Sequence, residues 1–228
     1  MKTKVSFLAA ILLGLGCLTG NAQGFINLNF ERAKIVTDPS YPYYAYASNA
    51  VPGWTAYLDG IPQSNIFYNE VSFGAAEVSI HDSNGTEGFE GFLPLAGRYS
   101  VLLQGTFGSG MPGEPSTAAI GQTGMIPIDM QSLIFWGALV SGLQVTFDGQ
   151  PIAFEAIGNG ANYTIYGADI SAFAGQAGEL LFSTSNNGWA MLDNIQFSSN
   201  PVPEPGTWSL LALGGAAFVF VRRKCWLA

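Results

Sequence analysis

The chain has 228 residues, of which 11% are charged, 13% are aromatic and 29 are glycine, and its formal net charge is −8. Five of the eight basic residues lie in the two ends, so the body between them is acidic and nucleic acid is excluded as a partner. Cys17 and Cys225 also lie in the hydrophobic ends, which excludes a disulfide framework or a catalytic thiol from the body.

Residues 1–22 have the pattern of a secretory signal peptide. Two lysines precede an apolar run over residues 5–18, and Gly20-Asn21-Ala22 offers the small residues that signal peptidase requires. We therefore expect a helical signal, with Gln23 as the new N-terminus. The alternatives are a buried N-terminal helix and a lipoprotein signal at Cys17.

The body, residues 23–200, has the hydrophobic pattern of β-strands. Apolar and polar residues alternate with a period of two, and Gly, Pro, Asn or Asp separate the segments. This spacing predicts an all-β antiparallel β-sandwich, with a hairpin turn at Asp148-Gly149 and one helical turn near 169–175 that Asp169 would cap. The expected strands are 25–31, 53–59, 65–73, 76–82, 98–107, 143–149, 152–158, 161–170, 178–185 and 189–197.

Aromatic residues are concentrated in "YPYYAYASNAVPGW", residues 41–54, a proline-containing stretch that we expect to be a loop. Aromatic faces with polar rims suit sugar rings, so Tyr43, Tyr44, Tyr46 and Trp54 are candidate sugar-binding residues. Nearby polar side chains would supply hydrogen bonds; they are Asn49, Asp59 and Asn65. The alternative is that these rings cover the end of the sandwich, and we expect Trp54 to be buried.

Four segments in this order resemble those of the galactose-binding-like jelly rolls, which include many carbohydrate-binding modules. They are "NLNFE" (27–31), "VPGWTAY" (51–57), "GRYSVLLQG" (97–105) and "LDNIQF" (192–197). The resemblance implies a jelly roll in which the first and last strands meet around a structural calcium ion. Glu31 and Asp193 match the acidic ligands of that site. The alternative is that both are ordinary acids at strand ends.

Catalysis has little support in the sequence. His81 is the single histidine, and we expect it to face water with Asp82 where a strand enters a turn, rather than to serve a Ser-His-Asp triad. Acids such as Glu70 and Glu77 would suit a glycosidase pair, but no spacing selects one pair. We therefore predict that the protein is not an enzyme.

The last part, residues 201–228, combines three features. Val202-Pro203-Glu204-Pro205 is held extended by its prolines. The apolar run 208–221 follows, and its 14 residues would form a hydrophobic helix about 21 Å long, against a hydrocarbon core of about 30 Å. Arg222, Arg223 and Lys224 come next, and such residues stay on the cytoplasmic side, which places the body outside the membrane.

This arrangement resembles the PEP-CTERM sorting signal of exported bacterial proteins, which is recognised by exosortase, a membrane-embedded cysteine protease. The resemblance implies export, a transient membrane tether and cleavage near Pro203-Glu204-Pro205. We expect a precursor tethered to the inner membrane and then a protein of the cell surface or extracellular matrix. Its role would be structural or adhesive among extracellular polysaccharide. The alternatives are a carbohydrate-binding module with a discrete sugar site and, with less support, a secreted glycoside hydrolase.

Overall fold

The computed structural model describes residues 24–84, 92–107 and 116–202. The predicted signal helix and the predicted C-terminal hydrophobic helix lie outside these ranges. Within them, none of the helices has the length and hydrophobicity needed to cross a membrane.

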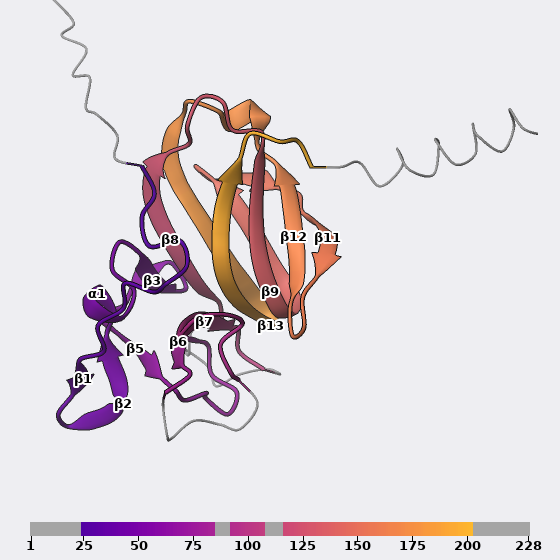
Figure 1. Ribbon diagram of the computed structural model, residues 1–228. Helices are drawn as coiled ribbons and strands as arrows, with labels where there is room; N and C mark the ends of the chain where they lie inside the picture. Colours follow the sequence, from indigo (N-terminus) through magenta and orange to yellow (C-terminus); the bar gives the residue numbers. More distant parts are fainter. Residues whose placement is uncertain (1–23, 85–91, 108–115, 203–228) are drawn as a thin grey trace, which may run out of the picture.

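The described chain is nearly all β-structure, which confirms the predicted fold class: thirteen strands form one large sheet that curls over on itself as a sandwich (Figure 1). One helical turn, α1 (Ala47–Ala50), and one 3-10 turn, η1 (Ser171–Phe173), interrupt it. The strands are β1 (Thr37–Asp38), β2 (Tyr41–Tyr46), β3 (Thr55–Leu58), β4 (Ile61–Pro62), β5 (Asn65–Tyr68), β6 (Glu77–Asp82), β7 (Tyr99–Gln104), β8 (Ala118–Met125), β9 (Ser132–Phe147), β10 (Gln150–Ile152), β11 (Glu155–Asn159), β12 (Thr164–Asp169) and β13 (Ala177–Ser198).

Two long strands, β9 and β13, form the centre of the sheet. They pair antiparallel from Leu180 opposite Phe147 to Ser198 opposite Ser132. On its other edge, the first half of β13 pairs with β8 and the second half pairs with β7. The remaining strands extend from these: β6, β5, β2 and β1 beyond β7, β3 and β4 beyond β8, and β10 and β12 beyond β9, with β11 paired to β12.

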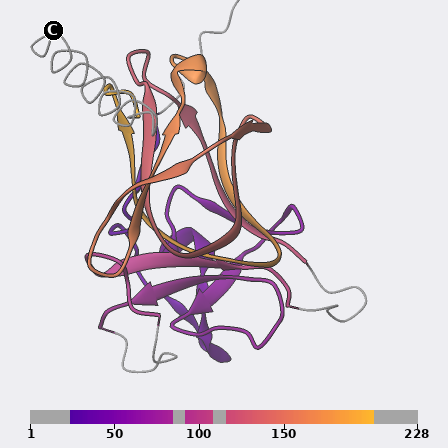
Figure 2. The same cartoon turned by 90° about the vertical axis from the view of Figure 1, so that its right-hand side faces the viewer.

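One strand pair departs from the predicted antiparallel arrangement. Strands β5 and β6 are parallel, with Phe67 opposite Ser79 and Tyr68 opposite Ile80. The chain between them, residues 69–76, must therefore cross back along the sheet before β6 begins. Figure 2 shows that the strands of the first hundred residues gather at one end of the molecule, below the long strands.

Two apolar clusters hold the sheet together. The main core lies inside the curl and contains the fully buried rings of Phe30, Phe135, Phe147 and Phe182. A second, smaller cluster lies on the other face of β7 and β13, where Leu102 and Met191 are covered by neighbouring loops. Alternate residues of β7 and β13 therefore serve two different cores.

Four sequence expectations need correction. Residues 25–31 are not a strand, because Asn27 and Phe30 have positive φ angles of 52° and 57° that turn the chain and bury Phe30. Residues 41–46 form strand β2 rather than a loop. The expected strands 178–185 and 189–197 are one strand of 22 residues, β13. Strand β8, in "AAIGQTGM", was not among the expected strands.

Two local predictions are confirmed. At the predicted hairpin turn, Asp148 and Gly149 have φ angles of 48° and 75°, and the flanking strands β9 and β10 pair with Phe147 opposite Gln150. At the predicted helical turn, the Oδ1 atom of Asp169 accepts a hydrogen bond of 2.9 Å from the backbone N–H of Ser171. That turn is of the 3-10 type and has Ile170 at its N-cap position, so Asp169 bonds to it from one residue before the cap.

Truncating Phe182 tests the main core. Its ring is fully buried and lies 5.4 Å from the ring of Phe135 and 6.4 Å from that of Trp54, so its removal would leave a cavity. Phe182→Ala should lower the free energy of unfolding by about 3–5 kcal/mol, measured by urea denaturation. Ile128→Ala, at a side chain that is 82% exposed, is the matched control and should change it by about 0.5 kcal/mol or less.

Candidate functional site

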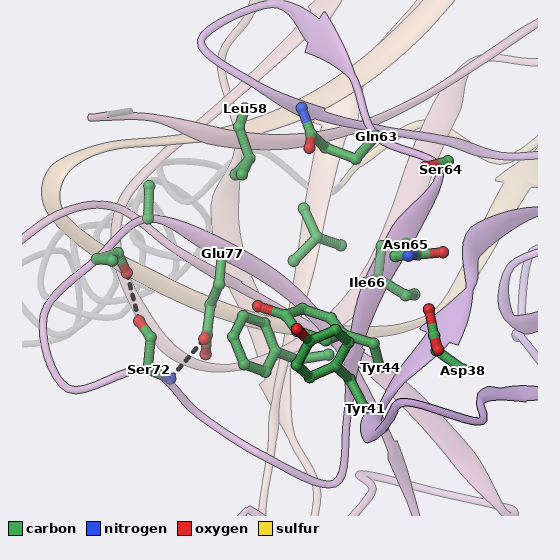
Figure 3. Close-up of a pocket in the computed structure, with 14 residues that line it drawn as sticks. Asp38, Tyr41, Tyr44, Leu58, Gln63, Ser64, Asn65, Ile66, Ser72 and Glu77 are labelled. Atoms are coloured by element: carbon green, nitrogen blue, oxygen red, sulfur yellow. Dashed lines mark hydrogen bonds between the residues drawn. The ribbon is translucent and has the colours of Figure 1, made fainter. Parts of the chain in front are cut away.

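A pocket of about 550 Å³ opens at the end of the molecule formed by β1, β2, β5 and β6 (Figure 3). Its walls come from three stretches of chain that the parallel pair β5–β6 brings together. Asp38 and Tyr44 line it from β1 and β2, Asn65 from β5, and Ser72 and Glu77 from the 69–76 crossover and the start of β6.

Aromatic rings form one wall of the pocket. The ring of Tyr44 lies 4.6 Å from that of Phe67, and the ring of Tyr43 lies 5.0 Å from that of Tyr44. Tyr41 meets Tyr44 edge-on at 6.4 Å. Tyr41 and Tyr43 are more than 40% exposed, so the cluster presents ring faces to solvent beside the pocket instead of disappearing into the core.

Two buried oxygen atoms on the pocket walls have no hydrogen-bond partner among the described residues. They are Oε1 of Glu77, a residue that is 1% exposed, and Oδ1 of Asn65. A buried acceptor without a partner costs free energy, and native proteins rarely leave one in place unless a ligand or water satisfies it. Two unsatisfied acceptors therefore lie within the walls of the pocket, beside the rings.

The protonation of Glu77 is set by its surroundings. Burial raises the pKa of Glu77 to about 7, and the nearby charge of Glu70 also raises it. The backbone N–H of Ser72 donates to Oε2 of Glu77 and opposes this rise. The proton of the neutral acid would therefore be carried by Oε1, the oxygen atom without a partner.

Gln104 fixes the crossover that covers Glu77, residues 69–76, through hydrogen bonds. The Nε2 atom of this fully buried residue of β7 donates to the carbonyl oxygen of Ala75 at 2.7 Å and to Oγ of Ser72 at 2.8 Å. Gln104 lies opposite Trp189 of β13 and opposite Glu77 of β6. The wall of the pocket is thus attached directly to the central strands.

The structure separates the four aromatic residues that the sequence offers for sugar binding. Tyr43 and Tyr44 belong to the ring cluster at the pocket, whereas Tyr46 is exposed and does not line it. Trp54 is 5% exposed, and its Nε1 atom donates to the carbonyl oxygen of Asn27 at 3.0 Å. Trp54, directly before β3, is therefore a core residue, which confirms its expected burial.

The three polar residues expected near the rings also separate. Asn65 lines the pocket, but Asn49 lines a different hollow. Asp59 accepts hydrogen bonds from Ser116 and Thr117, which lower its pKa despite some desolvation. Phe67 and Ser72 are not among the residues predicted from the sequence. Glu77 is predicted only as one of several acids from which no glycosidase pair can be selected. The alternation of Glu77, Ser79 and His81 along β6 was a signal for one polar strand face, which the structure buries.

Glu31 and Asp193 both hold the turn that leads into β7. Oε1 of Glu31 accepts hydrogen bonds from the backbone N–H groups of Arg98, at 2.7 Å, and Tyr99, at 3.1 Å. Oδ2 of Asp193 accepts from Oγ of Ser100 at 2.8 Å and from the N–H of Ala96 at 3.2 Å. Two acids that are far apart in the sequence, one in a turn and one within β13, therefore meet on one segment.

The fit of calcium to this pair rests on their charges. Burial raises the pKa of Asp193 to about 6, and the charge of Glu31 also raises it, so the two carboxylates repel one another. A cation between them would offset that repulsion, with backbone carbonyl oxygen atoms completing its shell. Within the described residues, no group of three or more His, Cys, Asp or Glu side chains is placed to hold a metal ion.

His81 and Asp82 do not face water, which corrects the sequence expectation. His81 is 2% exposed, burial lowers its pKa to about 4, and its Nε2 atom lies 3.2 Å from Oγ of Ser79. Asp82 forms a two-pronged ion pair with Arg98 at 2.8 and 2.9 Å. Asp82 pairs with Arg98 and does not orient His81, so this arrangement differs from a catalytic triad.

The comparisons with known proteins identify the tail. The model of the PEP-CTERM protein-sorting motif matches residues 201–224, as the sequence resemblance implies. This motif indicates an exported protein that is sorted to the cell surface. A comparison with curated proteins gives no match.

Several solved structures resemble the body. The Stig cyclase Fisc from Fischerella sp. TAU is 12% identical, with 80% of this chain and 98% of the cyclase covered and a TM-score of 0.42. The family 11 carbohydrate-binding module from Clostridium thermocellum is 15% identical, with 67% and 92% covered and a TM-score of 0.31. Tailspike protein 4 of bacteriophage CBA120 is 15% identical, with 64% and 19% covered and a TM-score of 0.35. None of these similarities is close enough to assign an activity.

Calcium removal tests the pair Glu31 and Asp193. If calcium joins these carboxylates, it stabilises the folded state by mass action, so a chelator should lower the melting temperature of the full chain by several degrees. Asp193→Asn removes one of the two charges and should abolish that sensitivity. An unchanged melting curve with and without chelator would leave the pair as hydrogen-bond acceptors for the turn alone.

The pH dependence of stability tests the burial of Glu77. Because its pKa in the folded state lies above the ordinary value of 4.5, its contribution to stability is complete below about pH 4.5 and is lost as the pH rises through 7. Glu77→Gln carries no proton equilibrium. The variant should therefore gain stability relative to the parent between pH 4.5 and pH 8, measured by urea denaturation, whereas Glu155→Gln on β11 serves as the control.

Proposed function

We propose that this protein is exported, processed by exosortase and retained outside the cell, where it binds extracellular polysaccharide without cleaving it. The sorting motif at residues 201–224 supports the first half of this proposal. In the precursor, residues 208–221 would form a transient tether in the inner membrane. Signal peptidase would remove residues 1–22, and the body would then act outside the cell.

The observation that carries the binding role is the combination of rings and unsatisfied acceptors in one pocket. Sugars present apolar ring faces edged by hydroxyl groups, so a site for them needs aromatic surface and hydrogen-bond partners together. Tyr41 and Tyr44 line the pocket that also contains Oε1 of Glu77 and Oδ1 of Asn65. A volume of about 550 Å³ is suitable for a short stretch of a glycan chain.

The position of the pocket agrees with a tether at residue 202. The chain leaves β13 beside the start of β9, where Oγ of Ser132 donates to the carbonyl oxygen of Asn200 at 2.7 Å and Nε2 of Gln131 donates to that of Ser199 at 2.9 Å. Strands β1, β2 and β5 lie at the other end of the molecule (Figure 1). A body held by its C-terminal end would therefore present the pocket away from the attachment point.

The sorting half of the proposal is tested at Glu204. A simple anchor needs the apolar run and its basic flank, whereas a sorting signal needs an enzyme to recognise the extended segment, for which Glu204 offers one carboxylate. Glu204→Ala should leave export and membrane insertion intact but block processing, so the uncut precursor should accumulate in the inner membrane. The measurement is fractionation and intact mass in a host that carries an exosortase.

The control for this experiment is the basic cluster. Replacing Arg222, Arg223 and Lys224 by serine should weaken retention and orientation before any processing takes place. Normal maturation of Glu204→Ala, with delivery to the surface at the parent's level, would show that the segment acts as a plain anchor.

The binding half is tested at the ring wall. Removing the Tyr44 ring deletes stacking surface at the pocket, so Tyr44→Ala should weaken binding to the best oligosaccharide of a glycan array by about tenfold or more. Tyr46→Ala, on the same strand but at a ring that does not line the pocket, is the matched control. Because detergents with sugar headgroups would compete, the full chain is kept in a detergent without one.

Turnover of the bound oligosaccharide decides between binding and hydrolysis. Release of reducing ends that is lost in Glu77→Gln would assign the protein to the glycoside hydrolases and refute the non-enzymatic proposal. Binding without any product supports it.

A further inference from the structure

The pocket also contains information about which sugars it accepts, because, among the described residues, two carboxyl groups and no basic side chain line it. The unsatisfied atoms, Oε1 of Glu77 and Oδ1 of Asn65, are both hydrogen-bond acceptors, and Asp38 adds a further carboxylate at the rim. Figure 3 shows Glu77, with its hydrogen bond to Ser72, at one end of the pocket and Asp38 and Asn65 at the other. Donor groups on a ligand would suit both ends, and the hydroxyl groups of Tyr41, Tyr44 and Ser64 line the same pocket.

Positive charge is absent from the described walls. Of the three basic residues in the described ranges, Arg98 is paired with Asp82, while Arg32 and Lys34 line a separate hollow together with Asn49. No lysine or arginine lines the pocket itself. A carboxylate or sulfate on a sugar would lose its water without gaining an ion pair, and it would meet two acids of its own sign.

A hydroxyl group fits Glu77 in either protonation state. Ionised Glu77 needs a donor at Oε1, and neutral Glu77 offers a proton there and needs an acceptor. A hydroxyl group both donates and accepts, so it satisfies both forms.

Building on the proposed polysaccharide-binding function, we propose that this pocket selects uncharged sugars through their hydroxyl groups and excludes uronic acids and sulfated sugars. Glu77 is the residue that sets this selectivity, and Asn65 contributes affinity without setting charge preference. The ring wall formed by Tyr41 and Tyr44 holds the apolar face of the same sugar.

The experiment compares matched oligosaccharides that differ in one group. Glucose, galactose and mannose oligomers are each titrated against the full chain beside their uronic acid counterparts, at pH 8 and low salt. The best neutral oligomer should bind about tenfold or more tightly than its uronic counterpart. Glu77→Gln keeps the shape and removes the charge, so it should narrow that ratio to about threefold or less while neutral binding stays within about threefold.

Two further variants keep the test independent of the folding of Glu77→Gln. Asn65→Ala should weaken binding of neutral and uronic oligomers by the same factor and leave their ratio unchanged. Gln144→Ala lies in a different hollow on β9 and should change neither. Circular dichroism of each variant checks that the fold is intact.

The outcomes separate the two proposals. Equal or tighter binding of a uronic oligomer overturns the selectivity and leaves polysaccharide binding in place. Absence of binding to every oligomer overturns polysaccharide binding itself, and the selectivity with it.

Discussion

The pairing of β9 with β13 is the constraint on which the rest of the fold depends. Both strands are longer than the others, with 16 and 22 residues, and they bend together where Leu139 and Asn187 take positive φ angles and the register shifts between Thr184 and Trp189. Such irregularities let a strand turn a corner without leaving its partner. Because β7 and β8 follow each other along the free edge of β13, the bend directs one group of strands over the other and closes the main core.

The same arrangement creates the pocket. Strand β7 carries Leu102 toward the small second core and Gln104 toward the crossover above it. The amide of Gln104 fixes that crossover, which then buries Glu77 at the start of β6. Gln104 of β7 thus determines the environment of Glu77, its direct partner on the adjacent strand β6. The raised pKa of Glu77 follows mainly from burial by the crossover.

The sequence predicts those parts of the fold that depend on local pattern. Alternation identifies β3, β5, β6 and β7, and the Asp148-Gly149 turn and the Asp169 cap follow from local chemistry. The long strands escape prediction because Gly142 and Gly188 look like turns, whereas in the sheet they are bends with little room for a side chain. For the pocket, composition locates the ring cluster, but the burial of Glu77 depends on Gln104, which is 27 residues away and has no local signal.

The acidity of the chain and the chemistry of the pocket both disfavour an anionic ligand. A body with three basic residues in its described ranges has little means of holding an anionic polymer by charge, and it would repel one over long distances at low salt. If the proposed polysaccharide binding holds, recognition rests on short-range contacts, namely stacking on rings and hydrogen bonds to acceptors. Tyr44 and Glu77 would supply one of each at the end of the molecule that lies away from residue 202. Under this proposal, an acidic protein that binds uncharged sugars would accumulate in a matrix without adhering to its anionic components.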